Sequence, residues 1–88
     1  MTYRVRYTAK ALRALENLPE KIATAALEFI VGPLAENPHR LGKQLRAPFD
    51  RFYGARRGQY RVIYEIFDDI IQIDIIDVAH RRDIYRRR

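Results

Sequence analysis

The sequence predicts a small α+β domain whose elements follow the order β-α-α-β-β-β. Two amphipathic helical segments fill most of the first half of the 88 residues, and segments with the alternating pattern of strands fill the second half. A further short alternating segment lies at the start. Because helices and strands grouped in this way favour separate layers, we expect a helical hairpin packed on one face of a small, mostly antiparallel sheet.

The first strand and the first helix meet at Thr8. Apolar and polar side chains alternate over residues 3–8, as in a half-buried strand. Thr8 has a side chain suited to capping a helix, which is predicted from about Ala9 to Asn17. Leu12 and Leu15 are expected to form its apolar side.

A second, longer helix is predicted from about Glu20 to Glu36. Pro19 suits its first turn, and Asn37-Pro38 ends it. Its expected apolar face consists of Ile22, Ala26, Phe29, Ile30 and Leu34. Gly32-Pro33 lies inside this helix and should kink it or loosen its hydrogen bonds.

The rest of the chain is predicted to form a loop and three strands. These are the loop 37–50 and strands at about 51–57, 60–67 and 70–78. Gly58 provides the turn between the first two strands. Asp68-Asp69 has the pattern of a two-residue hairpin connection, which would place Phe67 opposite Ile70.

This register separates the hairpin into an apolar face and a face with an arginine. The apolar face carries Val62, Tyr64, Ile66, Ile71, Ile73 and Ile75. We expect the helices to cover it. The other face carries Arg61, with Ile76 and Val78 nearby and His80 next in the alternation.

Positive charge is concentrated at one end of this hairpin. The net charge is +6, and 14 of the 17 basic residues are arginine. Residues 51–61 carry four arginines and no acid, and residues 80–88 carry five arginines and one aspartate. Because a guanidinium binds phosphate through a planar fork, this pattern favours a nucleic-acid ligand. The alternatives are a charge that only maintains solubility and a basic surface for an acidic protein.

Several kinds of protein are not favoured. There is no cysteine, and His39 and His80 do not have the spacing of metal ligands, so no metal or other cofactor is expected. No signal peptide and no membrane-spanning run is visible, which predicts a soluble cytoplasmic protein with no membrane partner. We expect one domain over residues 1–88, with 86–88 as a frayed basic tail.

Four segments in this order resemble the RelE/ParE toxin superfamily. They are Leu18-Pro19-Glu20-Lys21, Asn37-Pro38 followed by Gly42-Lys43-Gln44-Leu45-Arg46, the segment 56–64 (Arg-Arg-Gly-Gln-Tyr-Arg-Val-Ile-Tyr), and the segment 80–85 (His-Arg-Arg-Asp-Ile-Tyr). No segment is specific alone, but their order and spacing resemble the family over nearly the whole chain. Members are the toxins of type II toxin–antitoxin systems in bacteria and archaea.

The resemblance implies one of two activities. RelE-type toxins are ribosome-dependent endoribonucleases that cut mRNA in the A site and so inhibit translation and growth. The RNA's own 2′-hydroxyl attacks the phosphate, and no metal is needed. ParE-type toxins are the alternative, because they share the fold but inhibit DNA gyrase without nuclease activity. The segment 80–85 looks closer to the RelE branch.

Four residues are expected to carry the cleavage. By resemblance, Arg61 matches the arginine that holds the scissile phosphate, Arg81 matches a second phosphate-stabilising arginine, and Tyr85 matches a tyrosine near the 2′-hydroxyl. His80 is our candidate for the general acid, because alternation places it on the face of Arg61 and an imidazole exchanges protons near neutral pH.

The chain departs from the RelE pattern on the strand before Arg61. RelE-type enzymes carry lysines there, one of them proposed as general acid, but this chain has Phe52 or Tyr53, and Gly54, at those positions. The basic residues expected to contact RNA phosphates are Arg56, Arg57, Arg82, Lys43 and Arg46.

The resemblance also implies the partners. A cognate antitoxin should cover the basic surface with an acidic, partly disordered segment. The ribosome with its RNA and the mRNA are the expected targets. Because the chain has no helix-turn-helix or ribbon signature, operator DNA should be contacted only through the antitoxin complex.

Overall fold

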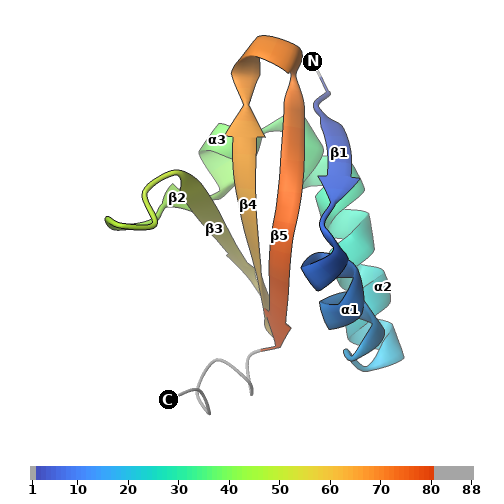
Figure 1. Cartoon of the computed structure of the whole chain (residues 1–88). Coiled ribbons are helices and arrows are strands. Elements are labelled where there is room, and N and C mark those ends of the chain that lie inside the picture. Colours follow the sequence, from blue (N-terminus) through green and yellow to red (C-terminus); the bar gives the residue numbers. More distant parts are fainter. Residues whose placement is uncertain (1, 81–88) are drawn as a thin grey trace.

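The computed structural model describes residues 2–80, so the expected tail at 86–88 lies outside it. The elements are β1 (Arg4–Tyr7), α1 (Ala9–Glu16), α2 (Glu20–Phe29), a π-helical turn (Ile30–Leu34), α3 (Pro38–Leu41), β2 (Lys43–Gln44), β3 (Phe52–Arg57), β4 (Tyr60–Phe67), a 3₁₀ turn (Asp68–Ile70) and β5 (Gln72–His80). Figure 1 shows their arrangement. Within residues 2–80, no helix combines the length and apolar character that crossing a membrane requires.

One five-stranded sheet has the order β1-β5-β4-β3-β2. Only β1 and β5 are parallel, and every other neighbouring pair is antiparallel. The α+β class and the mostly antiparallel sheet are therefore confirmed. The predicted loop contains two elements that were missed, α3 and β2, because segments of four and two residues are too short to show a periodic pattern.

Helix α1 begins as predicted but turns a different side toward the core. The Thr8 Oγ1 accepts a hydrogen bond from the Ala11 backbone N–H at 3.1 Å, which confirms the N-cap. Ala11 and Leu15 are buried, whereas Leu12 is 49% exposed, so the prediction for Leu12 is wrong. Positions 11, 15 and 18 follow one stripe of a 3.6-residue period, and Leu18 continues the buried stripe beyond the helix.

The second helix buries the predicted face, and its hydrogen-bond pattern changes around Gly32-Pro33, as predicted. Ala26, Phe29, Ile30 and Leu34 are buried, and Ile22 is half-buried. The segment Ile30–Leu34 is π-helical and contains Pro33. Because proline has no N–H to donate, the α-helical hydrogen-bond pattern cannot continue through it.

The connection between β4 and β5 is longer than predicted. Asp68–Ile70 form a 3₁₀ turn, and Ile71 has a φ of 52°. Phe67 therefore lies opposite Gln72, and the predicted pairing with Ile70 is wrong. Ile71, expected on the apolar face, belongs to the turn.

A β-bulge shifts the register again in the middle of the hairpin. Tyr64 pairs with Ile75, but its neighbour Ile63 pairs with Asp77, which leaves Ile76 as the extra residue. Beyond this bulge every residue of β5 points to the face opposite the one predicted.

The bulge changes the positions of Val78 and His80. Val78 pairs with Val62 and is buried, and His80 pairs with Tyr60. Directly paired residues share a face, so the prediction that Val78 and His80 lie on the face of Arg61 is wrong. Ala79 pairs with Arg61 instead.

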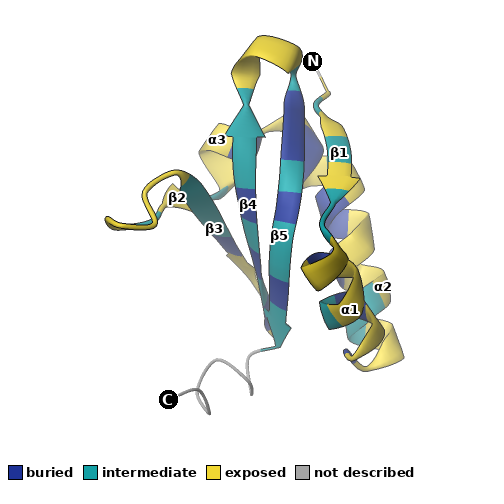
Figure 2. Ribbon diagram, in the orientation of Figure 1, coloured by how far each residue is buried: buried dark blue, intermediate teal, exposed yellow. Residues whose placement is uncertain are grey.

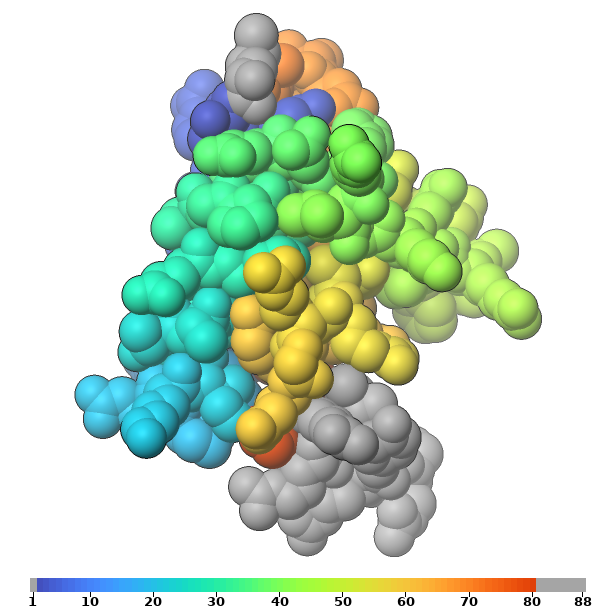
Figure 3. Space-filling model, turned by 180° about the vertical axis from the view of Figure 1, so that it is seen from behind, coloured from blue at the N-terminus to red at the C-terminus, as the bar shows by residue number. Residues whose placement is uncertain are grey.

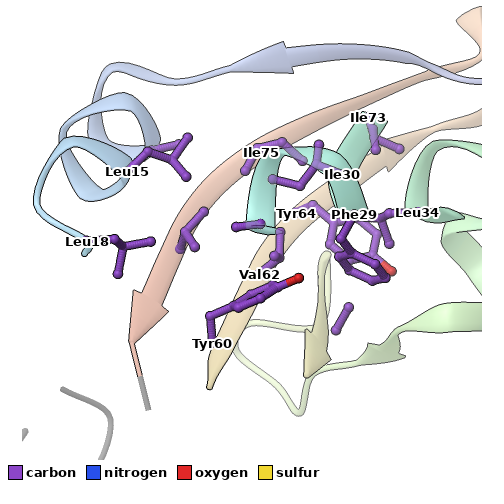
Figure 4. Packing of buried hydrophobic residues seen from close by; sticks show 14 residues of the cluster. Leu15, Leu18, Phe29, Ile30, Leu34, Tyr60, Val62, Tyr64, Ile73 and Ile75 are labelled. Atoms are coloured by element: carbon purple, nitrogen blue, oxygen red, sulfur yellow. The ribbon is translucent and has the colours of Figure 1, made fainter. Parts of the chain in front are cut away.

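The core lies between the helices and the sheet face that carries Val62. Figure 4 shows its side chains, and Figure 2 shows buried and less buried residues alternating along β4. It consists of Ala11, Leu15, Leu18, Ala26, Phe29, Ile30, Leu34, Ala55, Tyr60, Val62, Tyr64, Ile73, Ile75 and Val78. Since the helices cover this face, no helix within residues 2–80 covers the face that carries Arg61.

Candidate nucleic-acid interface

A groove of about 490 Å³ lies on the open face of the sheet, beside the edge strand β2. Its walls are formed by Leu41, Lys43, Leu45, Gly54, Arg56 and Arg61. The strand register explains this set, because Arg56 pairs with Arg61 and Lys43 pairs with Gly54. Paired residues point to the same face. The structure thus brings together Lys43, Arg56 and Arg61, three of the residues predicted to contact phosphate. We call this site the open-face groove.

Arg61 lies half-buried in the open-face groove. Its Nε atom is buried and has no hydrogen-bond partner among residues 2–80. A buried donor without a partner is costly, and a second guanidinium, that of Arg56, belongs to the residue directly opposite. An anion in the groove would accept a hydrogen bond from the Arg61 Nε and would reduce the repulsion between the two guanidinium groups. The groove therefore suits a phosphate.

Gly54 keeps this part of the groove open. A Cβ atom at position 54 would lie 3.3 Å from the Leu45 Cδ2, 3.4 Å from the Ile63 Cδ1 and 3.9 Å from the Arg61 Cδ. Gly54 is also one of the positions where the family pattern has a lysine. Its cross-strand partner is Lys43, so an ammonium group comes from the adjacent strand.

Arg57 lies on the opposite face of the sheet from the groove. It pairs with Tyr60, and its Cζ lies 4.8 Å from the ring centroid of Phe29, a cation–π contact. It lines a second hollow, of about 580 Å³, between α2 and the turn from β3 to β4. In Figure 3 these two segments lie side by side. The structure therefore separates Arg57 from Arg56 and Arg61.

The remaining predicted residues are also placed away from the groove or are not described. Arg46 is exposed in the loop 45–51 that links β2 to β3. His80 is half-buried at the end of β5. Arg81, Arg82 and Tyr85 lie outside the described residues. Among residues 2–80, no three His, Cys, Asp or Glu side chains are placed to share a metal ion.

A polar cluster that the sequence did not indicate lies beyond the other end of β4. The Tyr3 hydroxyl donates to the Asp68 Oδ1 at 2.6 Å, and the His39 Nε2 lies 2.9 Å from both carboxylate oxygens. Hydrogen bonds from Tyr3 and His39 hold the pKa of the Asp68 carboxyl below its usual range. The cluster ties the N-terminus and α3 to the turn before β5. The three residues are far apart in the chain, so only the fold reveals it.

The sequence is similar to toxins of toxin–antitoxin systems. Residues 5–85 match the family described as the ParE toxin of the type II toxin–antitoxin system parDE. Toxin RelE of Mycobacterium tuberculosis is 52% identical over 84 residues, which cover 96% of this chain and 87% of that protein. Toxin RelG of the same organism is 46% identical over 87 residues, which cover 99% of this chain and 100% of that protein.

Solved structures give the same result. A chain of the toxin–antitoxin complex RelBE2 from Mycobacterium tuberculosis matches with a TM-score of 0.90 and 42% identity, covering 92% of this chain and 100% of that one. The isolated RelE toxin of E. coli matches with a TM-score of 0.72 and 20% identity, covering 96% of this chain and 92% of that one. The second likeness shows a shared fold only.

Proposed function

The chain belongs to the RelE/ParE superfamily and is a type II toxin of RelE type, and from this premise we propose that it cuts mRNA in the ribosomal A site. In this reaction the RNA 2′-hydroxyl attacks the adjacent phosphate and the bond to the 5′-oxygen breaks. Translation and growth stop as a result. The observation that carries the proposal is the open-face groove. In it the buried Nε of Arg61, which has no hydrogen-bond partner within residues 2–80, lies beside Arg56 and Lys43.

Arg61 and Arg56 stabilise the charge that develops on the phosphate. Attack by the 2′-hydroxyl adds negative charge to the phosphorus centre, and fixed cations lower the energy of that state. Arg61 is held in the groove by its half-buried position, and Arg56 approaches from the facing strand. The proposed reaction takes its charge stabilisation from side chains and includes no metal. In the proposal, Arg81 is a second phosphate-stabilising arginine and Tyr85 lies near the attacking 2′-hydroxyl, as the family resemblance implies.

Lys43 is the best-placed proton donor for the leaving 5′-oxygen. Gly54 stands at one of the positions where the family resemblance implies a lysine, and Lys43 is its cross-strand partner in the same groove. A positioned ammonium can protonate a leaving oxygen. His80 pairs with Tyr60 on the other face, so the alternation that suggested it as the acid does not hold.

A cognate antitoxin is the proposed regulator. The similar RelBE2 structure of Mycobacterium tuberculosis is a toxin–antitoxin complex, and a RelE–RelB complex from Pyrococcus horikoshii has a TM-score of 0.70 with this chain at 31% identity. An acidic antitoxin segment over the groove would neutralise the cations that RNA needs. Operator DNA is contacted only through that complex, and the toxin acts in the cytoplasm, where its targets lie.

Primer extension on an mRNA in a purified translation system tests the activity. We expect wild-type protein to produce cuts within the A-site codon that disappear when ribosomes are omitted. Arg61→Ala should reduce the cutting rate about 100-fold or more, as expected when a charge-stabilising group is lost. Arg13→Ala, which removes an exposed arginine of α1, is the matched control and should cut like the wild type.

Two results would contradict this proposal. The assignment of Arg61 is wrong if Arg61→Ala cuts at the wild-type rate. An absence of cuts at protein levels that still arrest growth would support the ParE-type alternative, for which the glycine at position 54 is the favouring observation. Inhibition of gyrase in a DNA supercoiling assay would then establish that function.

A further inference from the structure

The loop 45–51 carries an exposed aromatic side chain beyond the edge of the sheet. Figure 1 shows this loop projecting from β2 and β3, away from α1 and α2. Phe49 is 58% exposed, although a phenylalanine in a folded domain is usually buried. More than half of its surface is therefore available for contact with a ligand.

The backbone around Phe49 is fixed by hydrogen bonds. The Phe49 N–H donates to the Arg46 carbonyl at 2.9 Å, and the Phe49 carbonyl accepts from the Phe52 N–H at 3.0 Å. The Gln44 Nε2 donates to the Asp50 carbonyl at 2.5 Å. The ring is thus exposed on an ordered support, and a ligand that contacts it loses little binding energy in ordering the loop.

Basic residues lie near Phe49 in the chain, and its loop adjoins the open-face groove. Residues 43–56 carry four basic side chains and one acid, Asp50. Arg46 and Arg51 flank Phe49 in the chain, and the Arg51 Cζ lies 4.8 Å from the ring centroid of Phe52. Leu45, at the start of the loop, lines the groove itself. The loop that carries Phe49 therefore begins at the wall of the groove.

We propose that Phe49 stacks on an unpaired base of the RNA whose phosphates occupy the open-face groove. The proposal rests on the function proposed above and adds a contact that holds the RNA strand. Aromatic rings among cations are typical of single-stranded RNA sites, where bases stack and phosphates pair with arginine. An RNA strand also supplies phosphates that can pair with Arg46 and Arg51, which an apolar protein surface does not.

A tryptophan at position 49 measures the contact directly. The chain has no tryptophan, so Phe49→Trp introduces a single fluorescent reporter that keeps a stacking ring. Val31→Trp is the matched control, because Val31 is 57% exposed and lies in the π-helical turn, away from the groove. We expect a short 2′-O-methyl oligoribonucleotide, which cannot be cleaved by its own 2′-hydroxyl, to quench the emission of Phe49→Trp and not that of Val31→Trp.

Phe49→Leu then measures the energetic contribution. It keeps an apolar side chain but removes the ring, and binding of the oligoribonucleotide should weaken about 5- to 150-fold, the range for one lost base stack. In the translation assay more protein should be needed for half-maximal cutting, with the cut positions unchanged. Phe49→Trp should cut nearly as well as the wild type.

Three outcomes would overturn the stacking proposal. These are equal binding and cutting by Phe49→Leu and the wild type, equal quenching of both tryptophan reporters, and a response of the Phe49→Trp reporter to the antitoxin but not to RNA. The last result would identify Phe49 as a protein anchor. Failure of the wild type to cut mRNA would contradict only the proposed nuclease, because the fluorescence titration does not depend on cleavage.

Discussion

Tyr64 connects the core to the wall of the open-face groove. It is fully buried, its hydroxyl donates to the Pro38 carbonyl at 2.5 Å, and its ring stacks on Tyr53 at 5.8 Å. Gly42 makes room for it, because a Cβ atom there would come within 2.1 Å of the Tyr64 hydroxyl oxygen. Since α3 leads directly into β2, this contact fixes where Lys43 enters the groove.

The burial of Tyr64 predicts a loss of stability in alkali. Burial, and to a lesser degree the nearby Tyr53, raises the pKa of Tyr64 well above the usual value of 10.0. The folded state therefore holds the phenolic proton more tightly than the unfolded state does. This stabilisation is fully present below pH 10 or so and is lost as the pH rises further.

Urea unfolding between pH 8 and pH 11 tests this prediction. The free energy of unfolding of the wild type should fall more steeply above pH 10 than that of Tyr64→Phe. Some slope should remain in the variant, because burial also raises the pKa of Tyr7 and Tyr60. Parallel curves for the two proteins would show that Tyr64 ionises equally well in the folded state.

At the scale of elements, the β4–β5 hairpin shows what sequence patterns can and cannot predict. The bounds of β4 were predicted correctly, because eight alternating residues carry a strong local signal. The turn was not predicted, because a β-branched residue such as Ile71 disfavours a positive φ. The Arg4 N–H donates to the Ile71 carbonyl at 2.8 Å, so a distant strand supports this conformation.

The bulge in β5 is also stabilised by hydrogen bonds from a residue far away in the chain, Thr8. The Thr8 N–H donates to the Ile75 carbonyl at 3.0 Å, and the Thr8 hydroxyl donates to the Ile76 carbonyl at 3.1 Å. No local pattern around Ile76 reveals these bonds. The bulge therefore escaped prediction, and with it the side of the sheet on which His80 lies.

The groove itself was partly predictable. The clustering of charge grouped Arg56 with Arg61, and Lys43 was predicted separately as a phosphate contact in the loop. The structure brings the three together. Arg57 was grouped with them, although neighbouring residues of a strand point to opposite faces, a signal already present in the sequence. The contribution of Lys43 through β2 was not visible, because a two-residue strand has no alternation to detect.

The double role of Thr8 leads to a prediction about stability. Its hydroxyl caps α1 and also bonds to the bulge. Thr8→Ala should lower the free energy of unfolding by about 1–2 kcal/mol, as for other lost caps. Thr8→Ser keeps the hydroxyl and should retain most of the stability. Equal losses in the two variants, measured by urea unfolding, would show that the hydroxyl contributes little.

At the scale of the whole molecule, the two faces of the sheet have separate tasks. One face packs on the helices and forms the core, and the other presents the open-face groove with Lys43, Arg56 and Arg61. With a net charge of +6, we expect the protein to attract a polyanion over some distance and the groove to align it at this face.

This separation predicts a strong salt dependence of RNA binding. Each phosphate contact to a single strand releases counterions and contributes about −0.7 to the slope of log affinity against log salt. In titrations of the 2′-O-methyl oligoribonucleotide at increasing salt, Arg56→Ala should make the slope shallower by about that amount. Arg13→Ala should not change it. Binding that does not respond to salt would argue against phosphate contacts in the groove.

The pairing of the first strand with the last has a consequence for biosynthesis. β1 pairs only with β5, the described strand that is synthesised last, and not with β2, β3 or β4. β5 also supplies Ile73, Ile75 and Val78 to the core. A nascent chain without β5 lacks both the partner of β1 and this part of the interior. Such distant pairing also forms late in folding. The toxin therefore completes its fold only after residue 80 has emerged from the ribosome.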